Sequence, residues 1–143
     1  MGTTYETFNK QLAALQNLFT FDSIDYVTVP DLQFEVKAGE KWVFEVNLFT
    51  NSIDVSFRVA AVSPAGSTGL MAVINAENAT VRGVGINTDT VVSVTPGTDD
   101  LIQIKGIVNA GGSGVVQFQL RNNTGTTVQS FRADSWIEAT QIS

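Results

Sequence analysis

The residues whose types could do chemistry are few in this 143-residue chain, and the clearest of them are carboxylates. Asp99 and Asp100 are adjacent, and Asp89 lies ten residues upstream of the first. Paired carboxylates can transfer protons or hold a cation, but neighbouring residues of a strand point to opposite faces of a sheet. The pair is therefore not expected to converge on one site, and a solvated loop before a strand explains it better.

The chain has no histidine and no cysteine, which excludes ordinary zinc, haem and thiolate sites and leaves only an all-carboxylate calcium or magnesium site open. Ser135 has no histidine to activate it, and a serine–lysine pair would need Lys37, Lys41 or Lys105 beside a serine. Gly83-Val84-Gly85 lacks the third glycine and the helix of a nucleotide-binding fingerprint. We predict no catalytic, cofactor-binding or metal-binding residue, and a protein that is not an enzyme.

The composition favours a rigid β-protein with little affinity for nucleic acid. The net charge is −6 and the pI is about 4.4, whereas a protein that neutralises phosphates needs a basic surface. Only 15% of the residues are charged, compared with about 25% in typical domains. No apolar run reaches the roughly 20 residues that span a bilayer, and the first residues lack the basic and apolar parts of a signal peptide. We expect no nucleic-acid partner and no membrane partner.

Every second residue is apolar in several stretches, which is the period of a strand with one buried face. The clearest example is 41–47, with Trp42, Phe44 and Val46. Turn residues separate such stretches at intervals of about 8–12 residues, which predicts an all-β fold, an antiparallel β-sandwich or jelly roll. The predicted core is Phe34, Trp42, Phe44, Val46, Val55, Phe57, Val59, Ile102, Ile104, Val116, Phe118 and Ile137.

The N-terminal segment follows a different pattern, in which apolar residues recur at steps of four, three and four. This spacing predicts a short amphipathic helix, whose apolar stripe is Phe8, Leu12, Leu15 and Phe19. We divide the chain into an N-terminal helical arm or anchor, 1–23, and a jelly-roll domain, 24–143. Because a helix this short is marginal in isolation, the stripe is expected to pack on its own sandwich or a neighbouring one, or on copies of itself at a symmetry axis.

Some large apolar residues are predicted to point away from the core. If Ile137 is buried in the last strand, then Trp136 points outward, because neighbouring strand residues alternate. Val43 and Val115 likewise alternate with core residues of their strands. An outward aromatic side chain usually has a cover, so these residues and the N-terminal stripe are the predicted interface, although loops of the same chain are the alternative cover.

From about residue 32 onward, three stretches of the chain resemble a family of bacteriophage virion proteins. The stretches are LQFEVKAGEKWVFE at 32–45, DVSFRVAAVSPAG at 54–66, and 102 to the end, with KGIV at 105–108, GVVQFQL at 114–120 and DSWIEA at 134–139. Members of this family have a trimeric jelly-roll domain similar to that of tumour necrosis factor. They serve as head decoration proteins and as tail or fibre domains.

The resemblance implies a homotrimer located in the virion, with the major capsid protein or another virion protein as partner. A single domain with a short extension and no fibrous shaft favours a capsid decoration, or cement, protein that stabilises the head. A tail or baseplate adaptor or receptor-binding tip is the first alternative. A carbohydrate-binding β-sandwich module is the second, and exposed aromatic residues aligned on one sheet face would favour it.

Overall fold

The structure is a computed structural model that describes residues 9–51, 56–75, 80–94, 99–123 and 129–143. These residues form twelve β-strands and no helix. The strands are β1 (Lys10–Ala14), β2 (Phe19–Phe21), β3 (Val27–Val36), β4 (Lys41–Asn51), β5 (Ser56–Val62), β6 (Thr68–Asn75), β7 (Thr80–Gly85), β8 (Asp89–Ser93), β9 (Asp99–Asn109), β10 (Gly114–Asn122), β11 (Gln129–Phe131) and β12 (Trp136–Gln141).

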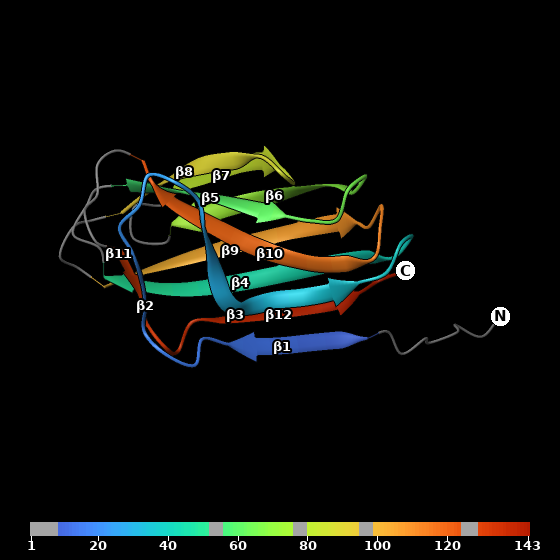
Figure 1. The fold of residues 1–143 in the computed structure, drawn as a ribbon, viewed down its shortest axis with the longest axis horizontal. Helices are drawn as coiled ribbons and strands as arrows, with labels where there is room; N and C mark the ends of the chain where they lie inside the picture. The colour runs from blue at the N-terminus through green and yellow to red at the C-terminus, as the bar shows by residue number, and fades with distance from the viewer. Residues whose placement is uncertain (1–8, 52–55, 76–79, 95–98, 124–128) are drawn as a thin grey trace.

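The order in which the strands pair defines a jelly roll. Strand β6 pairs with β7, β5 with β8, β4 with β9 and β3 with β10, all antiparallel. The chain from β3 to β6 therefore runs alongside the returning chain from β7 to β10, as one long double ribbon. Successive strands of this ribbon alternate between two facing sheets (Figure 1), which is the jelly-roll arrangement.

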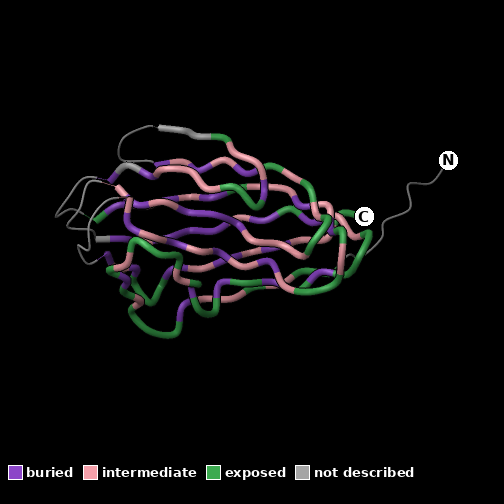
Figure 2. Tube along the Cα trace, turned by 45° about the horizontal axis from the view of Figure 1, so that its top comes forward, coloured by how far each residue is buried: buried purple, intermediate pink, exposed green. Residues whose placement is uncertain are grey.

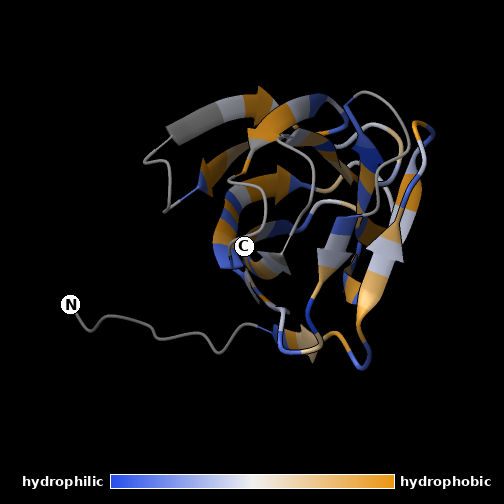
Figure 3. Ribbon diagram, turned by 90° about the vertical axis from the view of Figure 1, so that its left-hand side faces the viewer, coloured by the Kyte–Doolittle hydropathy of each residue, from blue (hydrophilic) through white to orange (hydrophobic). Residues whose placement is uncertain are grey.

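The two sheets are unequal in size. The small sheet has the order β3-β10-β5-β8, and the large sheet has the order β1-β12-β4-β9-β6-β7, with β11 and β2 attached at one end. Strands β12 and β1 extend the large sheet beyond β4, so β1 and β7 are its two opposite edges (Figure 1). Seen along the strands, hydrophobic and hydrophilic residues alternate in both layers (Figure 3).

The predicted core is confirmed wherever the structure describes it. Eleven of the twelve predicted residues are at most 4% exposed, while Val55 lies outside the described residues. Buried residues recur along the length of the strands (Figure 2), and they form one hydrophobic cluster. Aromatic rings join the layers, for example Phe44 and Phe118, whose ring centroids are 5.6 Å apart. The all-β sandwich follows from this alternation of buried and exposed residues.

The predicted N-terminal helix is wrong for the described part of its range. Residues Lys10–Ala14 form β1, which pairs antiparallel with β12 along its whole length, and Phe19–Phe21 forms β2, which pairs with β11. A helix this short satisfies few of its own backbone groups, whereas the free edge of β12 offers a complete ladder. In the described residues, the predicted arm of 1–23 is therefore built into the large sheet.

The adjacent carboxylates at the start of β9 are only partly as predicted. Their side chains do face opposite ways, since the Asp99 side chain is 66% exposed and Asp100 is 3% exposed. The prediction that both are solvated is wrong for Asp100, because this residue belongs to β9 and alternates in phase with the buried residues Ile102 and Ile104, which places its side chain on the inner face. In the described residues, no helix is long and apolar enough to cross a bilayer.

Candidate functional site: the outer face of the large sheet

The most unusual surface of the sandwich is the solvent side of the large sheet, which we call the outer face. Its side chains are the residues that alternate with the core residues of β1, β12, β4, β9, β6 and β7. Two of the most exposed large hydrophobic residues in the described structure lie there, Leu12 at 67% and Leu70 at 66%, together with Val43 at 36%. Exposed apolar residues grouped on one face indicate an interaction surface.

Strand register arranges the outer face in rows that cross the whole sheet. One row contains Leu12, Glu138, Glu45, Lys105, Ala72 and Gly83, and the next contains Lys10, Thr140, Val43, Ile107, Leu70 and Gly85. In the first row the charged residues lie between Leu12 and Ala72. In the second row Lys10 lies at the edge, and Val43 and Ile107 lie in the middle of the sheet. An interface built on these rows would combine apolar patches with paired charges.

The charges of these two rows cancel within the chain. Lys10 Nζ lies 2.7 Å from Glu138 Oε1, and Lys105 Nζ lies 3.7 Å from Glu45 Oε1. Two positive and two negative side chains therefore give the rows no net charge, although the whole chain carries −6. Copies of an acidic protein repel one another in general, but this surface adds no repulsion of its own.

Three of the predicted interface residues lie on the outer face. Trp136 points outward as predicted, because Ile137 beside it is 1% exposed and belongs to the core. Leu12, Val43 and Trp136 share this side of the sheet, on β1, β4 and β12. Their contact with a partner remains a prediction.

The other predicted interface residues lie elsewhere. Leu15 is 2% exposed and belongs to the core, which corrects the prediction that it faces a partner. Phe19 packs against the core, with its ring centroid 6.4 Å from that of Phe131. Val115 lies on β10, in the small sheet, and Phe8 lies outside the described residues. The helical spacing of the N-terminal stripe predicts the wrong orientation for Leu15 and Phe19, because the described part of the segment does not form a helix.

Leu70, Ala72 and Ile107 also lie on the outer face, although they are not among the predicted interface residues. The sequence does contain a pattern that indicates this surface, since Leu70 and Ala72 alternate with the buried residues Met71 and Val73. A strand that is apolar at every position is expected to be covered on both sides. In this structure β6 is covered by its own chain on the inner side alone, where Met71 and Val73 are buried.

The small sheet carries a compact charge cluster around Asp89. Arg58 donates to this carboxylate through Nε at 2.8 Å and Nη2 at 3.2 Å, and Arg121 Nη2 donates to it at 3.4 Å. The Tyr26 hydroxyl also donates to Asp89, and the Arg121 guanidinium lies 5.2 Å from the centroid of the Tyr26 ring. Arg58 Nη1 donates to Asn123 at 3.2 Å. These contacts tie β5, β8 and β10 to the chain before β3.

The bonds from Arg58, followed by that from Tyr26, lower the pKa of Asp89 from 3.8 to about 2. Between these pH values the unfolded chain binds more protons at this position than the folded chain, so stability rises with pH there. The stabilisation is complete above about pH 4 and is lost as the pH falls toward 2. Since the side chain is 20% exposed, we expect about 1–2 kcal/mol.

Asp89→Asn is therefore expected to lower the free energy of unfolding at pH 7 and to flatten its decline between pH 4 and pH 2. Urea unfolding at several pH values measures both effects. Asp99→Asn, which removes a carboxylate that is 66% exposed, is the control and should leave this decline unchanged. An unaltered decline in Asp89→Asn would contradict the assignment.

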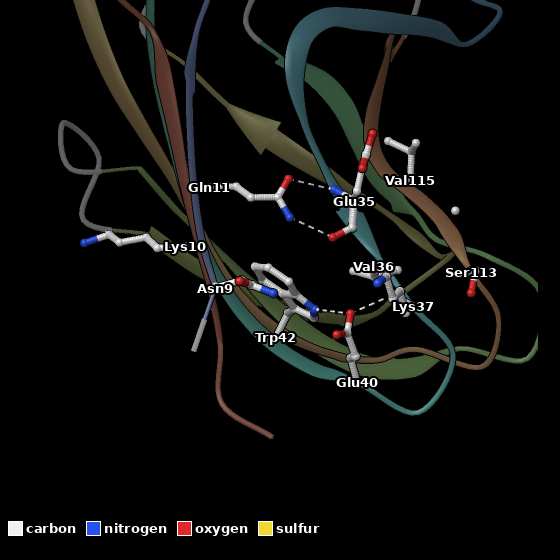
Figure 4. Close-up of a pocket in the computed structure, with 11 residues that line it drawn as sticks. Asn9, Lys10, Gln11, Glu35, Val36, Lys37, Glu40, Trp42, Ser113 and Val115 are labelled. Atoms are coloured by element: carbon white, nitrogen blue, oxygen red, sulfur yellow. Dashed lines mark hydrogen bonds between the residues drawn. The ribbon is translucent and has the colours of Figure 1, made fainter. Parts of the chain in front are cut away.

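A pocket of about 510 Å³ opens at the edge of the sandwich, where β1 and β3 approach each other (Figure 4). The Trp42 indole forms part of its wall and donates to Glu40 Oε1 at 3.2 Å, and the Lys37 amide donates to the same oxygen at 2.7 Å. Trp42 is 1% exposed, so its ring offers no open face for stacking. The pocket has the size of a ligand site, but these polar groups are occupied within the chain.

Gln11 joins the two sheets beside this pocket. Its Nε2 donates to the Glu35 carbonyl at 2.8 Å, and its Oε1 accepts from the Glu35 amide at 2.9 Å (Figure 4). The side-chain amide thus pairs with the free edge of β3 as a neighbouring strand would. Edge strands with unpaired backbone groups promote unwanted pairing, and Gln11 covers this position.

Gln11→Ala is expected to lower the free energy of unfolding by about 1–2 kcal/mol, because two hydrogen bonds are lost at a half-exposed edge. Hydrogen exchange measured by NMR should show faster exchange at the Glu35 amide. Gln33→Ala, at an exposed position of the same strand, is the matched control. Unchanged exchange at Glu35 in the Gln11 variant would show that the clasp does not form in solution.

In the part of the chain that the structure describes, no group of three or more acidic side chains is placed to hold a metal ion. The described fold and surface together define a jelly-roll β-sandwich with an apolar, charge-balanced outer face.

The comparisons with known proteins do not assign the chain to a family. No family model matches the chain, and no curated protein matches it. Among solved structures, the Eiger TNF of S. frugiperda is similar with a TM-score of 0.46 and 10% identity, over 96% of this chain and 94% of that chain. A carbohydrate-binding module of Cellvibrio mixtus lichenase 5A gives 0.40 and 14%, over 93% and 98%.

The VP2 subviral particle of infectious bursal disease virus is similar with a TM-score of 0.32 and 10% identity, over 94% of this chain and 41% of that chain. The three proteins differ widely in their roles, and similarities of this size carry no argument about function. The jelly-roll assignment rests on the strand pairing of the chain itself.

Proposed function

We propose that this chain is a non-enzymatic structural protein of a virus particle, which forms a homotrimer and decorates the capsid. The observation that carries the proposal is the outer face, with Leu12 and Leu70 each about two-thirds exposed and with charged side chains that pair within the chain. A jelly roll is a common architecture of virion proteins, although lectins and cupins share it. The sequence resemblance to trimeric phage domains favours the first of these classes.

The proposed mechanism is mechanical. A trimer placed over a threefold or quasi-threefold position contacts several capsid subunits at once, and linked weak contacts add as avidity. Each contact then raises the free energy needed to separate capsid subunits under the pressure of the packaged genome. The net charge of −6 keeps such a protein soluble and away from nucleic acid.

The carbohydrate-binding alternative requires an aromatic ring with an open face. Trp42 does not meet this requirement, because it is 1% exposed and its ring lies 5.7 Å from that of Phe34 in the core. Trp136 is accessible only in part and lies on the outer face, where it serves the assembly proposal equally well. A tail or baseplate adaptor would use the same outer face and differs only in its location on the particle.

Electron cryomicroscopy of virus particles purified from infected cells that produce this chain tests the proposal. We expect density of trimer size on the outside of the head, over local threefold positions. Density at the tail would favour the adaptor alternative over decoration. Purified particles that carry no copy of the chain, although the infected cells produce it, would contradict a structural role in the virion.

A further inference from the structure

Within the described residues, nothing requires a glycine at Gly83, in the middle of β7. Glycine in a strand interior weakens the strand and often marks a place where another backbone or a ligand approaches. A Cβ built at Gly83 would meet no atom within 4 Å, and the backbone does not adopt a positive φ there. Gly106, on the nearby strand β9, does have such a reason, because a Cβ there would lie 2.4 Å from Phe44 Cζ.

The missing side chain of Gly83 leaves a depression in the outer face, which we call the hollow. Its volume is about 670 Å³, and its outward lining is Leu70, Ala72, Gly83, Gly85 and Ile107, with Lys105 at the side. The hollow lies over β6, β7 and β9, near one edge of the large sheet. It is an apolar depression that no described part of the chain fills.

The opposite edge of the same face carries a protrusion, which we call the ridge. It consists of Leu12 on β1, which is 67% exposed, and Trp136 on β12. Ala14 pairs with Trp136, so Leu12 is the diagonal neighbour of that indole on the same side of the sheet, within reach of a large side chain. One molecule thus presents a partly exposed apolar pair and an apolar depression near the two edges of one sheet. The edge strands β1 and β7 lie on opposite sides of that sheet (Figure 1).

Each of the two features has one ion pair beside it. Glu138 pairs in register with Leu12 of the ridge and lies 2.7 Å from Lys10, and Lys105 pairs in register with Ala72 of the hollow. Lys105 is 55% exposed and its ammonium group lies 3.7 Å from Glu45, which is beyond hydrogen-bond distance, so it is loosely held. A ridge seated in a hollow would bring the Lys10–Glu138 pair beside the Lys105–Glu45 pair, so that groups of opposite charge can meet without a net charge on either side.

We infer that copies of this chain join head to tail, with the ridge of one copy seated in the hollow of the next. The contact is heterologous, since two different patches of the same chain meet, and such contacts form a closed ring when the rotation from copy to copy closes and an open filament when it does not; the proposed homotrimer is the closed case. The inference rests on the proposed homotrimer and names the surfaces that build it. It also accounts for Gly83, because any larger side chain would fill the seat of the ridge.

Two variants test the ridge and the hollow separately. Leu12→Asp places a charge on the ridge, and Gly83→Val fills the hollow with a residue that favours strands. Each variant is expected to be monomeric in sedimentation velocity at concentrations where the wild type is trimeric. Gly83→Val should also keep the far-UV circular dichroism spectrum of the wild type and unfold cooperatively, which separates lost assembly from lost folding. Its thermal midpoint is expected to fall only by the stabilisation that assembly provides. Leu18→Asp, which changes a leucine that is 62% exposed in the loop before β2, is the control and should remain trimeric.

Mixing the two variants gives the sharpest result. Leu12→Asp retains an intact hollow, and Gly83→Val retains an intact ridge, so the mixture should form a heterodimer with one junction and grow no further. The inference would be overturned if the wild type is a trimer and either variant is still a trimer, or if the mixture of the two variants stays monomeric. Both outcomes would leave the homotrimer proposal standing. A wild-type dimer would overturn the ring, and a wild-type monomer would overturn both proposals.

Discussion

Phe57→Ala is expected to lower the free energy of unfolding by about 3–5 kcal/mol, the usual cost of emptying a buried aromatic site. Phe57 is fully buried, and its ring lies edge-on to Phe131 at 5.5 Å and 71° and to Phe21 at 6.2 Å and 80°. These rings come from β5, β11 and β2, so the substitution removes the contact between the small sheet and the end of the large one. Urea unfolding at a fixed protein concentration measures the loss.

Phe19→Ala is the matched control, because Phe19 belongs to the same ring cluster and is only partly buried. Its cost should be clearly smaller than that of Phe57→Ala. Equal costs for the two variants would show that the ring of Phe57 is not enclosed as the structure has it.

Removal of residues 1–16 is expected to unfold the domain or to lower its free energy of unfolding by at least about 3 kcal/mol. The truncation deletes β1, which pairs with β12 along Lys10–Ala14. It also deletes Leu15, which is 2% exposed and whose amide donates to the Ser135 carbonyl at 2.9 Å. Loss of a buried leucine side chain alone costs about 2–5 kcal/mol.

A chain that lacks only residues 1–8 is the control, because it retains all of β1 and should unfold like the full chain. Circular dichroism during heating compares the two truncations. A shorter chain, without residues 1–16, that melts at the wild-type temperature would show that the N-terminal segment is a separate attachment, as its sequence pattern first indicated.

The sheet interior could be predicted from the sequence because burial on one face imposes a period of two. Trp42, Phe44 and Val46 show this period without interruption, and all three are buried as expected. The orientation of Trp136 followed from the same rule. The prediction of the buried faces is strong because many strands share one core, and the orientation of each strand restricts the orientation of its neighbours.

The N-terminal segment could not be predicted in this way, because its structure depends on a distant partner. Leu12 and Leu15 have helical spacing, yet the ladder with β12 places one outside and the other in the core. Local spacing carries no information about a free strand edge more than 100 residues away. Pairing between segments far apart in sequence overrides weak local preference in such cases.

The hollow was also beyond reach of the sequence. Gly83 and Gly85 interrupt an apolar stretch, and by themselves they indicate a bulge or a turn as readily as an open strand. Only the register of β7 on β6 places Gly83 beside Ala72 and Gly85 beside Leu70, on the outer face. A side chain at Gly83 would meet only empty space, so the fold does not require glycine at this position. We therefore attribute the glycine to a partner.

The mass of the wild-type protein in solution tests the central claim most directly. Light scattering coupled to size exclusion, at micromolar concentration and moderate salt, measures it without a label or a partner. The account predicts three copies of the 15.3 kDa chain in one particle, with a mass that falls to one copy in Leu12→Asp. A single-copy mass for the wild type at every concentration would contradict the assembly, and with it the role proposed for the outer face.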